Sequence, residues 1–237
     1  MSVLAIDIGG TNIKILATGQ KEPRRFPSGE KMTPKQMVAG VKRLASDWQY
    51  DVVSIGYPGM VKAGRLFSEP NNLAPGWVGF DFERAFRRPV KLINDAAMQA
   101  MGSYQGGVML FLGLGTGLGS ALIVNDTVVP MELGRLSYKD GTIEDYLGRQ
   151  GLTRLGRKRW ERLLAGVAMR LSAAIHLDDL VVGGGNAKKL TYLPAGCRVG
   201  SNANAFIGGF RMWNEEERPR ALAPARDAAT KGEARKT

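Results

Sequence analysis

The chain alternates between short apolar runs and longer segments in which apolar residues recur at helical spacing. The apolar, β-branched runs predict strands at Val3–Ile8, Ile13–Ala17, Val52–Tyr57, Val90–Ile93, Val108–Leu114, Ala121–Val124, Val128–Pro130, Leu180–Val182 and Cys197–Gly200. Helical spacing and capping residues predict helices from Thr33-Pro34 to Trp48, at Phe80–Phe86, from Asn94-Asp95 to about Tyr104, at Arg157–His176 and at Ala203–Trp213. Strands that alternate with helices in this way indicate an α/β protein.

One unit of this pattern occurs twice. A strand that ends in a glycine turn opens each half of the chain, at Asp7–Thr11 and at residues 113–119, and Gly106-Gly107 separates the halves. We therefore predict an internal duplication, with an N-terminal lobe at residues 1–106 and a C-terminal lobe at residues 107–214 that face a central cleft. Residues 215–237 are polar and contain two prolines, so we expect a disordered tail there.

Composition narrows the class of protein. With 237 residues, 44% of them hydrophobic and 23% charged, the chain is typical of a globular protein, and no apolar stretch is long enough for a bilayer. The single cysteine, Cys197, excludes an internal disulfide and a multi-cysteine zinc site. The first residues lack the basic flank and apolar core of a signal peptide, so we expect a cytoplasmic protein that makes no membrane contact.

The charge balance favours anionic ligands. The formal net charge is +11, and the densest basic stretch contains Arg149, Arg154, Arg157, Lys158, Arg159 and Arg162. Such a stretch attracts polyanions, whether nucleotides, polyphosphate, nucleic acid or acidic lipid, although a run of like charges is also an ordinary solvent-exposed helix face. Trp160 is the one aromatic residue among these charges, so the stretch lacks the stacking residues of a nucleic-acid interface and no DNA partner is expected.

Three glycine turns follow predicted strands and suit the binding of phosphate. Glycine lets backbone N–H groups approach an anion closely, and the first turn adds a carboxylate suited to Mg²⁺, two polar side chains and a cation: Asp7, Gly9, Gly10, Thr11, Asn12 and Lys14. The other two turns contain Gly115, Thr116, Gly117 and Gly119, and then Gly183, Gly184 and Gly185. Each turn alone could be an ordinary strand connection, but three of them in both halves favour a nucleotide cleft.

Two common phosphate motifs do not fit the second turn. It lacks the Gly-Lys-Ser/Thr ending of a Walker loop. It is also followed by an apolar, β-branched strand, whereas a dinucleotide-binding turn is followed by a helix.

Six motifs together resemble the ROK family of sugar kinases, and within it the bacterial polyphosphate glucokinases. They stand in the family's order across residues 3–212, at residues 7–14 (DIGGTNIK), 56–59 (GYPG), 94–96 (NDA), 115–120 (GTGLGS), 132–134 (ELG) and 183–185 (GGG). The resemblance implies a two-lobed actin/hexokinase-like (ribonuclease H-like) α/β fold with a central nucleotide cleft. It implies transfer of the terminal phosphoryl group of ATP, or of polyphosphate, to a hexose hydroxyl, with glucose as the first acceptor to expect and glucose 6-phosphate as its product.

The resemblance also implies roles for individual residues. Asp95 matches the family's general base, and the residues at the positions of sugar contacts are Gly59, Asn94, Glu132, Glu144 and, in place of the family's histidine, Arg135. The three glycine turns match contacts to the donor phosphates and adenosine, with Asp7 as a Mg²⁺ ligand. Helix capping would explain Asn94 without any sugar, and the helix N-terminus is expected to keep Asp95 ionised. Homodimers are common in the family.

The sequence departs from the family pattern at three points. The cysteine cluster that holds zinc in many members is missing, so no zinc is expected, as in the polyphosphate glucokinases. Arg135 replaces the histidine of the Glu-Leu-Gly-His motif, and arginine can only donate hydrogen bonds; it could instead bind an anionic sugar or the transferring phosphoryl group. ROK repressors carry an N-terminal helix-turn-helix domain, and because the first phosphate turn begins at Asp7 we expect no such domain here. A non-catalytic protein that binds sugar or nucleotide is the alternative to a kinase.

Overall fold

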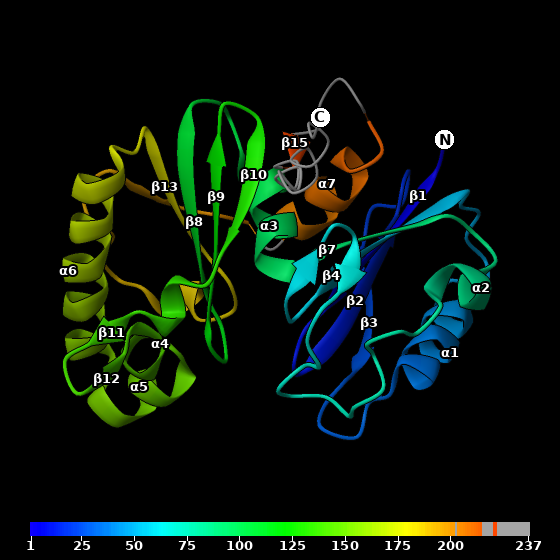
Figure 1. The fold of residues 1–237 in the computed structure, drawn as a ribbon, viewed down its shortest axis with the longest axis horizontal. Helices are drawn as coiled ribbons and strands as arrows, with labels where there is room; N and C mark the ends of the chain where they lie inside the picture. The colour runs from blue at the N-terminus through cyan, green and yellow to red at the C-terminus, as the bar shows by residue number, and fades with distance from the viewer. Residues whose placement is uncertain (202, 215–219, 222–237) are drawn as a thin grey trace, which may run out of the picture.

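Each half of the chain forms its own β-sheet, and a pair of helices lies between the two sheets (Figure 1). The computed structural model describes residues 1–201, 203–214 and 220–221. The predicted tail lies outside these residues except for β15 (Arg220–Ala221), which pairs with β10. In the described part of the chain, no helix combines the length and the hydropathy needed to cross a membrane.

The N-terminal sheet has the strand order β3-β2-β1-β4-β7. Its strands are β1 (Val3–Ile8), β2 (Asn12–Ala17), β3 (Arg24–Pro27), β4 (Val52–Tyr57) and β7 (Val90–Asn94). β1 pairs antiparallel with β2 and parallel with β4, and β4 pairs parallel with β7. All six residues of β1 and of β4 are buried, which explains why apart from Asp7 and Ser54 these two strands are apolar throughout.

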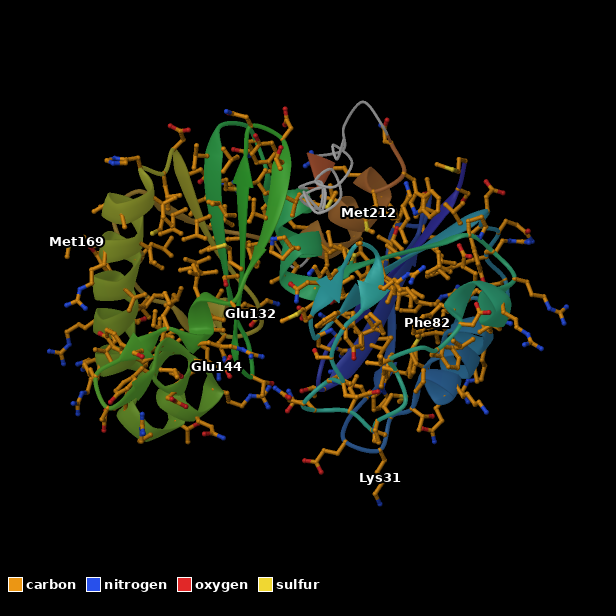
Figure 2. The ribbon with its side chains drawn as sticks, viewed as in Figure 1. Lys31, Phe82, Glu132, Glu144, Met169 and Met212 are labelled. Carbon is orange, nitrogen blue, oxygen red and sulfur yellow. The ribbon has the colours of Figure 1, made fainter. Side chains whose placement is uncertain are left out.

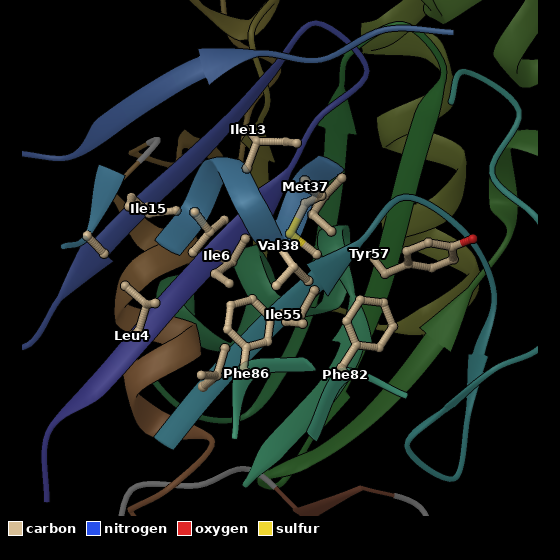
Figure 3. Packing of buried hydrophobic residues seen from close by; sticks show 14 of the residues in the cluster. Leu4, Ile6, Ile13, Ile15, Met37, Val38, Ile55, Tyr57, Phe82 and Phe86 are labelled. Carbon is tan, nitrogen blue, oxygen red and sulfur yellow. The ribbon is translucent and has the colours of Figure 1, made fainter. Parts of the chain in front are cut away.

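Helices α1 (Pro34–Leu44) and α2 (Phe82–Phe86) belong to the N-terminal half of the chain. Their apolar residues pack on the sheet, and Figure 3 shows Met37, Val38 and the rings of Phe82 and Phe86 beside Ile55. Thr33 begins α1 in a reciprocal capping box with Gln36, which confirms the predicted N-cap. This core keeps β1 and β4, and therefore the ends of both strands, in fixed positions.

The C-terminal sheet repeats the strand arrangement. Its order is β14-β13-β8-β9-β10-β15, and its strands before the tail are β8 (Val108–Leu114), β9 (Leu118–Val124), β10 (Thr127–Met131), β13 (Asp179–Gly183) and β14 (Cys197–Val199). An antiparallel trio, β8-β9-β10, is followed by the parallel strands β13 and β14, as β1-β2-β3 is followed by β4 and β7. The same order in both sheets supports the predicted duplication. Next to this sheet lie α4 (Ile143–Leu147), α5 (Arg149–Leu155) and the long α6 (Arg157–Ile175).

Helices α3 (Asp95–Ser103) and α7 (Asn204–Arg211) pack against each other between the sheets. Although α7 belongs to the C-terminal half of the chain, it contacts β1 and β4 of the N-terminal sheet. The buried Ser54 hydroxyl donates to the Gly209 carbonyl (2.6 Å) and accepts the Trp213 indole N–H (2.9 Å). The segment from α7 to Trp213 thus packs against the N-terminal sheet, and the division at residues 106 and 107 stays a prediction.

Several elements have no counterpart in the prediction. They are β3, the hairpin β5 (Val61–Lys62) and β6 (Arg65–Leu66), the 3₁₀-helix Leu133–Arg135, the pair β11 (Ser137–Tyr138) and β12 (Gly141–Thr142), α4, α5 and the 3₁₀-helix Ala187–Lys189. All are short, and periodicity is a weak signal over so few residues.

Candidate active site

A cleft of about 670 Å³ is lined by segments from both halves of the chain. Every residue predicted for the site lines this cleft except Gly183: Asp7, Gly9, Gly10, Thr11, Asn12, Lys14, Gly59, Asn94, Asp95, Gly115, Thr116, Gly117, Gly119, Glu132, Arg135, Glu144, Gly184 and Gly185. Gly183 is the last residue of β13 and is buried beside the ring of Phe111, one residue behind the turn. The three glycine turns therefore converge, as the sequence predicts.

The first turn joins β1 to β2. The Gly9 N–H donates to the Asn12 carbonyl (3.1 Å), which closes the turn. The Lys14 ammonium donates to Asp7 Oδ2 (3.2 Å), and Asp7 is buried with 6% of its surface exposed. Register explains this pair, because Asp7 and Lys14 are directly opposite in the β1–β2 ladder. The turn therefore presents a carboxylate and an ammonium at one side of the cleft.

The second and third turns are joined to each other. Gly115 N–H donates to the Gly117 carbonyl (3.1 Å), so residues 115–117 form a tight turn between β8 and β9. Asn186, which follows the third turn, donates from its side-chain amide to the Gly115 carbonyl (2.8 Å). Gly184 has φ +84° and its Cα lies against Leu114, so a side chain there would meet backbone. The two turns form one backbone surface on the C-terminal side of the cleft.

Asn94 and Asp95 lie where β7 ends and α3 begins. Asn94 is the N-cap of α3: its Oδ1 accepts the Ala97 N–H (3.1 Å), and its Nδ2 donates to the Gly59 carbonyl (3.1 Å). Capping therefore accounts for the Asn94 side chain and also ties Gly59 to the base of α3. Asp95 accepts the adjacent Ala96 N–H (2.8 Å) and lines the cleft.

The pKa of Asp95 is raised from 3.8 to about 7. Burial is the largest cause, because it disfavours the charged carboxylate, and the negative charges of Asp7 and Glu132 act in the same direction. The backbone N–H of Ala96 lowers the pKa, but by less. The prediction that the helix N-terminus keeps Asp95 ionised is therefore wrong near neutral pH, because burial outweighs the backbone donor. Its carboxylate is poised to take up a proton near neutral pH.

Two glutamates come from the C-terminal half. Figure 2 shows Glu132 and Glu144 on the part of this lobe that faces the other lobe. Glu132 precedes the 3₁₀-helix Leu133–Arg135, and the Arg135 guanidinium lies 3.6 Å from its carboxylate; the Arg135 side chain is largely exposed and that of Glu132 about half exposed. Glu144 is in the first turn of α4, where its Oε2 accepts the Leu118 N–H (2.9 Å).

Further polar residues of the cleft were not among the predicted site residues, and they include Ser68, Glu69, Asn71, Asn72, Gln99, Ser120 and Asn186. Glu69 accepts three consecutive backbone N–H groups, from Gly76, Trp77 and Val78, and so fixes the loop that leads to Trp77. Only the Asn71-Asn72 pair next to Pro70 could have been noticed as a loop signal in the sequence. Arg149, Asp145 and Gln150 also line the cleft, from α4 and α5.

The residues present fit a magnesium–phosphate complex better than a metal held by protein alone. Among the residues that the structure describes, no group of three or more His, Cys, Asp or Glu side chains could hold a metal ion. Mg²⁺ in phosphoryl-transfer sites needs only one or two carboxylates, since phosphate oxygens and water complete its shell. Asp7 offers such a carboxylate beside the first turn.

The basic stretch on α5 and α6 lies outside the cleft apart from Arg149. Its other five cations are exposed, as on an ordinary solvent-facing surface. Trp160 is fully buried, and its indole N–H donates to the Leu147 carbonyl (2.9 Å). Trp160 is therefore not available to stack on a nucleic-acid base.

The chain is similar to proteins of known family and to several named sugar kinases. Residues 3–132 match the ROK family. N-acetylmannosamine kinase from Escherichia fergusonii is 32% identical over 139 residues, 52% of this chain and 47% of that protein, so the chain spans about half the length of this relative. Polyphosphate glucokinase from Mycobacterium tuberculosis is 25% identical over 209 residues, 78% of this chain and 77% of that protein.

The fold also matches a solved structure. The inorganic polyphosphate/ATP-glucomannokinase from Arthrobacter sp. strain KM superposes with a TM-score of 0.76 at 24% sequence identity, over 88% of this chain and 96% of that chain. The similarity covers both sheets and confirms the predicted actin/hexokinase-like α/β fold.

Proposed function

The chain belongs to the ROK family, and from this premise we propose that it is a kinase that transfers the terminal phosphoryl group of ATP, or of polyphosphate, to a hexose hydroxyl. Glucose is the first acceptor to test. The observation that carries the proposal is the position of Asp95: a carboxylate with a pKa of about 7 lines the same cleft as three glycine turns. A site for phosphoryl transfer needs this combination of a proton acceptor and a phosphate cradle.

The proposed reaction assigns each group one task. The Asp95 carboxylate accepts the proton of the sugar hydroxyl while that oxygen attacks the terminal phosphorus of the donor, and the bond from phosphorus to the leaving phosphate oxygen breaks. Glu132, Asn94 and Glu144 offer acceptor oxygens to the other sugar hydroxyls. Backbone N–H groups of the turns and the Lys14 ammonium face the donor phosphates.

The charge of the cleft favours a donor bound with a cation. Its lining contains six carboxylates but only three cations, Lys14, Arg135 and Arg149. A donor with several negative charges would be repelled by such a surface unless a metal ion accompanied it. Mg²⁺, when bound through Asp7 and the phosphates, would neutralise this charge.

A matrix of donors and sugars tests the proposal. ATP and polyphosphate, each with Mg²⁺, would be combined with glucose, mannose and N-acetylmannosamine, and the sugar phosphate formed would be measured by mass spectrometry. We expect product with at least one pair and none without a sugar. A full matrix without product would contradict the kinase.

Arg135 favours a second candidate, a protein that binds sugar without turnover. At position 135 the family has a histidine, which could both accept and donate hydrogen bonds. The arginine can only donate, and its guanidinium is paired with Glu132. Sugar-dependent thermal stabilisation without any phosphorylation would support this candidate.

Replacement of Arg135 by alanine is expected to raise the KM for the sugar about tenfold, because Arg135 orients the Glu132 carboxylate and donates to the sugar itself. The KM for the donor should change less than twofold. Arg159→Ala is the charge-matched control, since Arg159 is exposed on α6 outside the cleft. An unchanged sugar KM in Arg135→Ala would show that this arginine has no part in sugar binding.

A further inference from the structure

We infer that Ser28 and Asn186 are positioning residues that hold the two phosphate turns by their carbonyl groups. The inference rests on the proposed function and extends it to residues outside the predicted site. Ser28 contacts the turn of the N-terminal lobe, and Asn186 contacts the turn of the C-terminal lobe. In each case a side-chain donor binds the carbonyl of a glycine in the turn.

The physical reason lies in the two ends of a peptide group. A turn binds phosphate through N–H groups, whereas a carbonyl that faces the anion repels it. Glycine peptides rotate easily, because glycine has few steric limits on φ and ψ. A donor that holds the glycine carbonyl fixes the orientation of that peptide plane before the donor phosphates arrive, and so lowers the ordering cost of binding.

Ser28 makes two hydrogen bonds to the first turn. Its hydroxyl donates to the Gly9 carbonyl (2.6 Å), and its backbone N–H donates to the Thr11 carbonyl (3.0 Å). It directly follows β3, where Pro27 is opposite Asn12. Ser28 does not line the cleft, so it can affect a bound donor only through the turn.

Its segment is held at the other end as well. The Met32 carbonyl accepts the Ala74 N–H (3.2 Å), and Thr33 then begins α1. The segment 28–32 therefore connects the first turn to the loop that contains Asn71 and Asn72, and Asn72 lies 3.4 Å from the position that a Cβ on Gly10 would take.

Asn186 gives the corresponding support in the other lobe, although unlike Ser28 it also lines the cleft. Its side-chain amide donates to the Gly115 carbonyl (2.8 Å), and its backbone N–H donates to the Leu114 carbonyl (2.9 Å). The side chain is buried, with 6% of the residue exposed. Two residues distant in sequence thus give the two turns the same kind of support.

Calorimetric titration with MgADP and with glucose tests the inference. For Ser28→Ala and Asn186→Ala we expect the Kd of MgADP to rise about three- to tenfold, the range for one hydrogen bond. The Kd of glucose should change less than twofold. Ser28→Thr keeps the hydroxyl and should restore the MgADP affinity to within twofold of the wild type.

Ser103→Ala is the control for a purely structural effect. The Ser103 hydroxyl is buried, bonds to Gln99 and Asn204 between α3 and α7, and touches neither turn. We expect a lower Tm with both Kd values unchanged. If Ser28→Ala and Asn186→Ala also lowered the Tm without changing either Kd, this inference would be overturned, but the proposed function would not. A wild-type protein that binds neither MgADP nor glucose would overturn the proposed function together with it.

Discussion

Replacing Asp95 by asparagine is expected to lower kcat for sugar phosphorylation by about 100-fold or more, the usual contribution of a general base. Asparagine keeps the size of the side chain and can still accept the Ala96 N–H, so the start of α3 should be unchanged. What it loses is the ability to accept the hydroxyl proton. The kcat would be measured with the donor and sugar that give most product, beside Glu22→Gln, an exposed carboxylate outside the cleft. A loss of less than tenfold would contradict the role of Asp95.

The pKa of Asp95 gives this prediction a pH dependence. The base must be deprotonated to act, and its pKa is about 7. Activity of the wild-type protein should therefore rise as the pH increases from 6 to 8, with a midpoint near 7. Asp95→Asn should lose this limb of the profile. A flat wild-type profile over this range would show that another group is the base.

The raised pKa of Asp95 also makes the free energy of unfolding depend on pH, but here the effect of a rising pH is a loss, whereas activity increases. The folded state keeps the Asp95 proton up to about pH 7, whereas the unfolded chain releases it near the ordinary aspartate pKa of 3.8. Because the unfolded state then binds fewer protons, wild-type stability falls as the pH rises between these values, and stays reduced above them. Asp95→Asn should thus be more stable than the wild type at pH 8, and the difference should shrink toward pH 4. Tm values across this range would measure it.

The strands and the turns that follow them were predictable because their signals are local. Val3–Ile8, Val52–Tyr57 and Val108–Leu114 are buried runs with the predicted bounds. Glycines at strand ends then mark the turns, whatever the rest of the chain does. β3 was missed because Arg24, Arg25 and Pro27 are unusual in a strand, and they are tolerated at the edge of the sheet.

The contacts that orient the site are not local, and the sequence carries no sign of them. The Asn186 amide bonds a carbonyl 71 positions earlier in the chain. The raised pKa of Asp95 depends on burial and on Glu132, which comes from the other half of the chain. Motif resemblance identified Asp95, but only the three-dimensional arrangement shows that burial outweighs the backbone donor at the start of α3.

The crossing of α3 and α7 gives the second large prediction. A Cβ on Gly208 would lie 1.8 Å from the Met98 carbonyl oxygen, and one on Gly102 would lie 1.9 Å from the Asn204 carbonyl oxygen. Both neighbours are backbone atoms of a packed helix, which cannot move aside as a side chain can. Gly208→Ala is therefore expected to reduce the free energy of unfolding by about 3 kcal/mol or more. Urea denaturation followed by circular dichroism would measure it.

Gly166→Ala is the matched control, because Gly166 is also inside a helix but has open space around its Cα. Alanine is the better helix former, so this variant should gain up to about 1 kcal/mol. Since α3 begins with Asp95, any Gly208→Ala protein that still folds should also lose activity, as its helices are forced apart. Equal stability of the two variants would mean that the helices do not cross this closely, and the position of Asp95 in the cleft would then need another support.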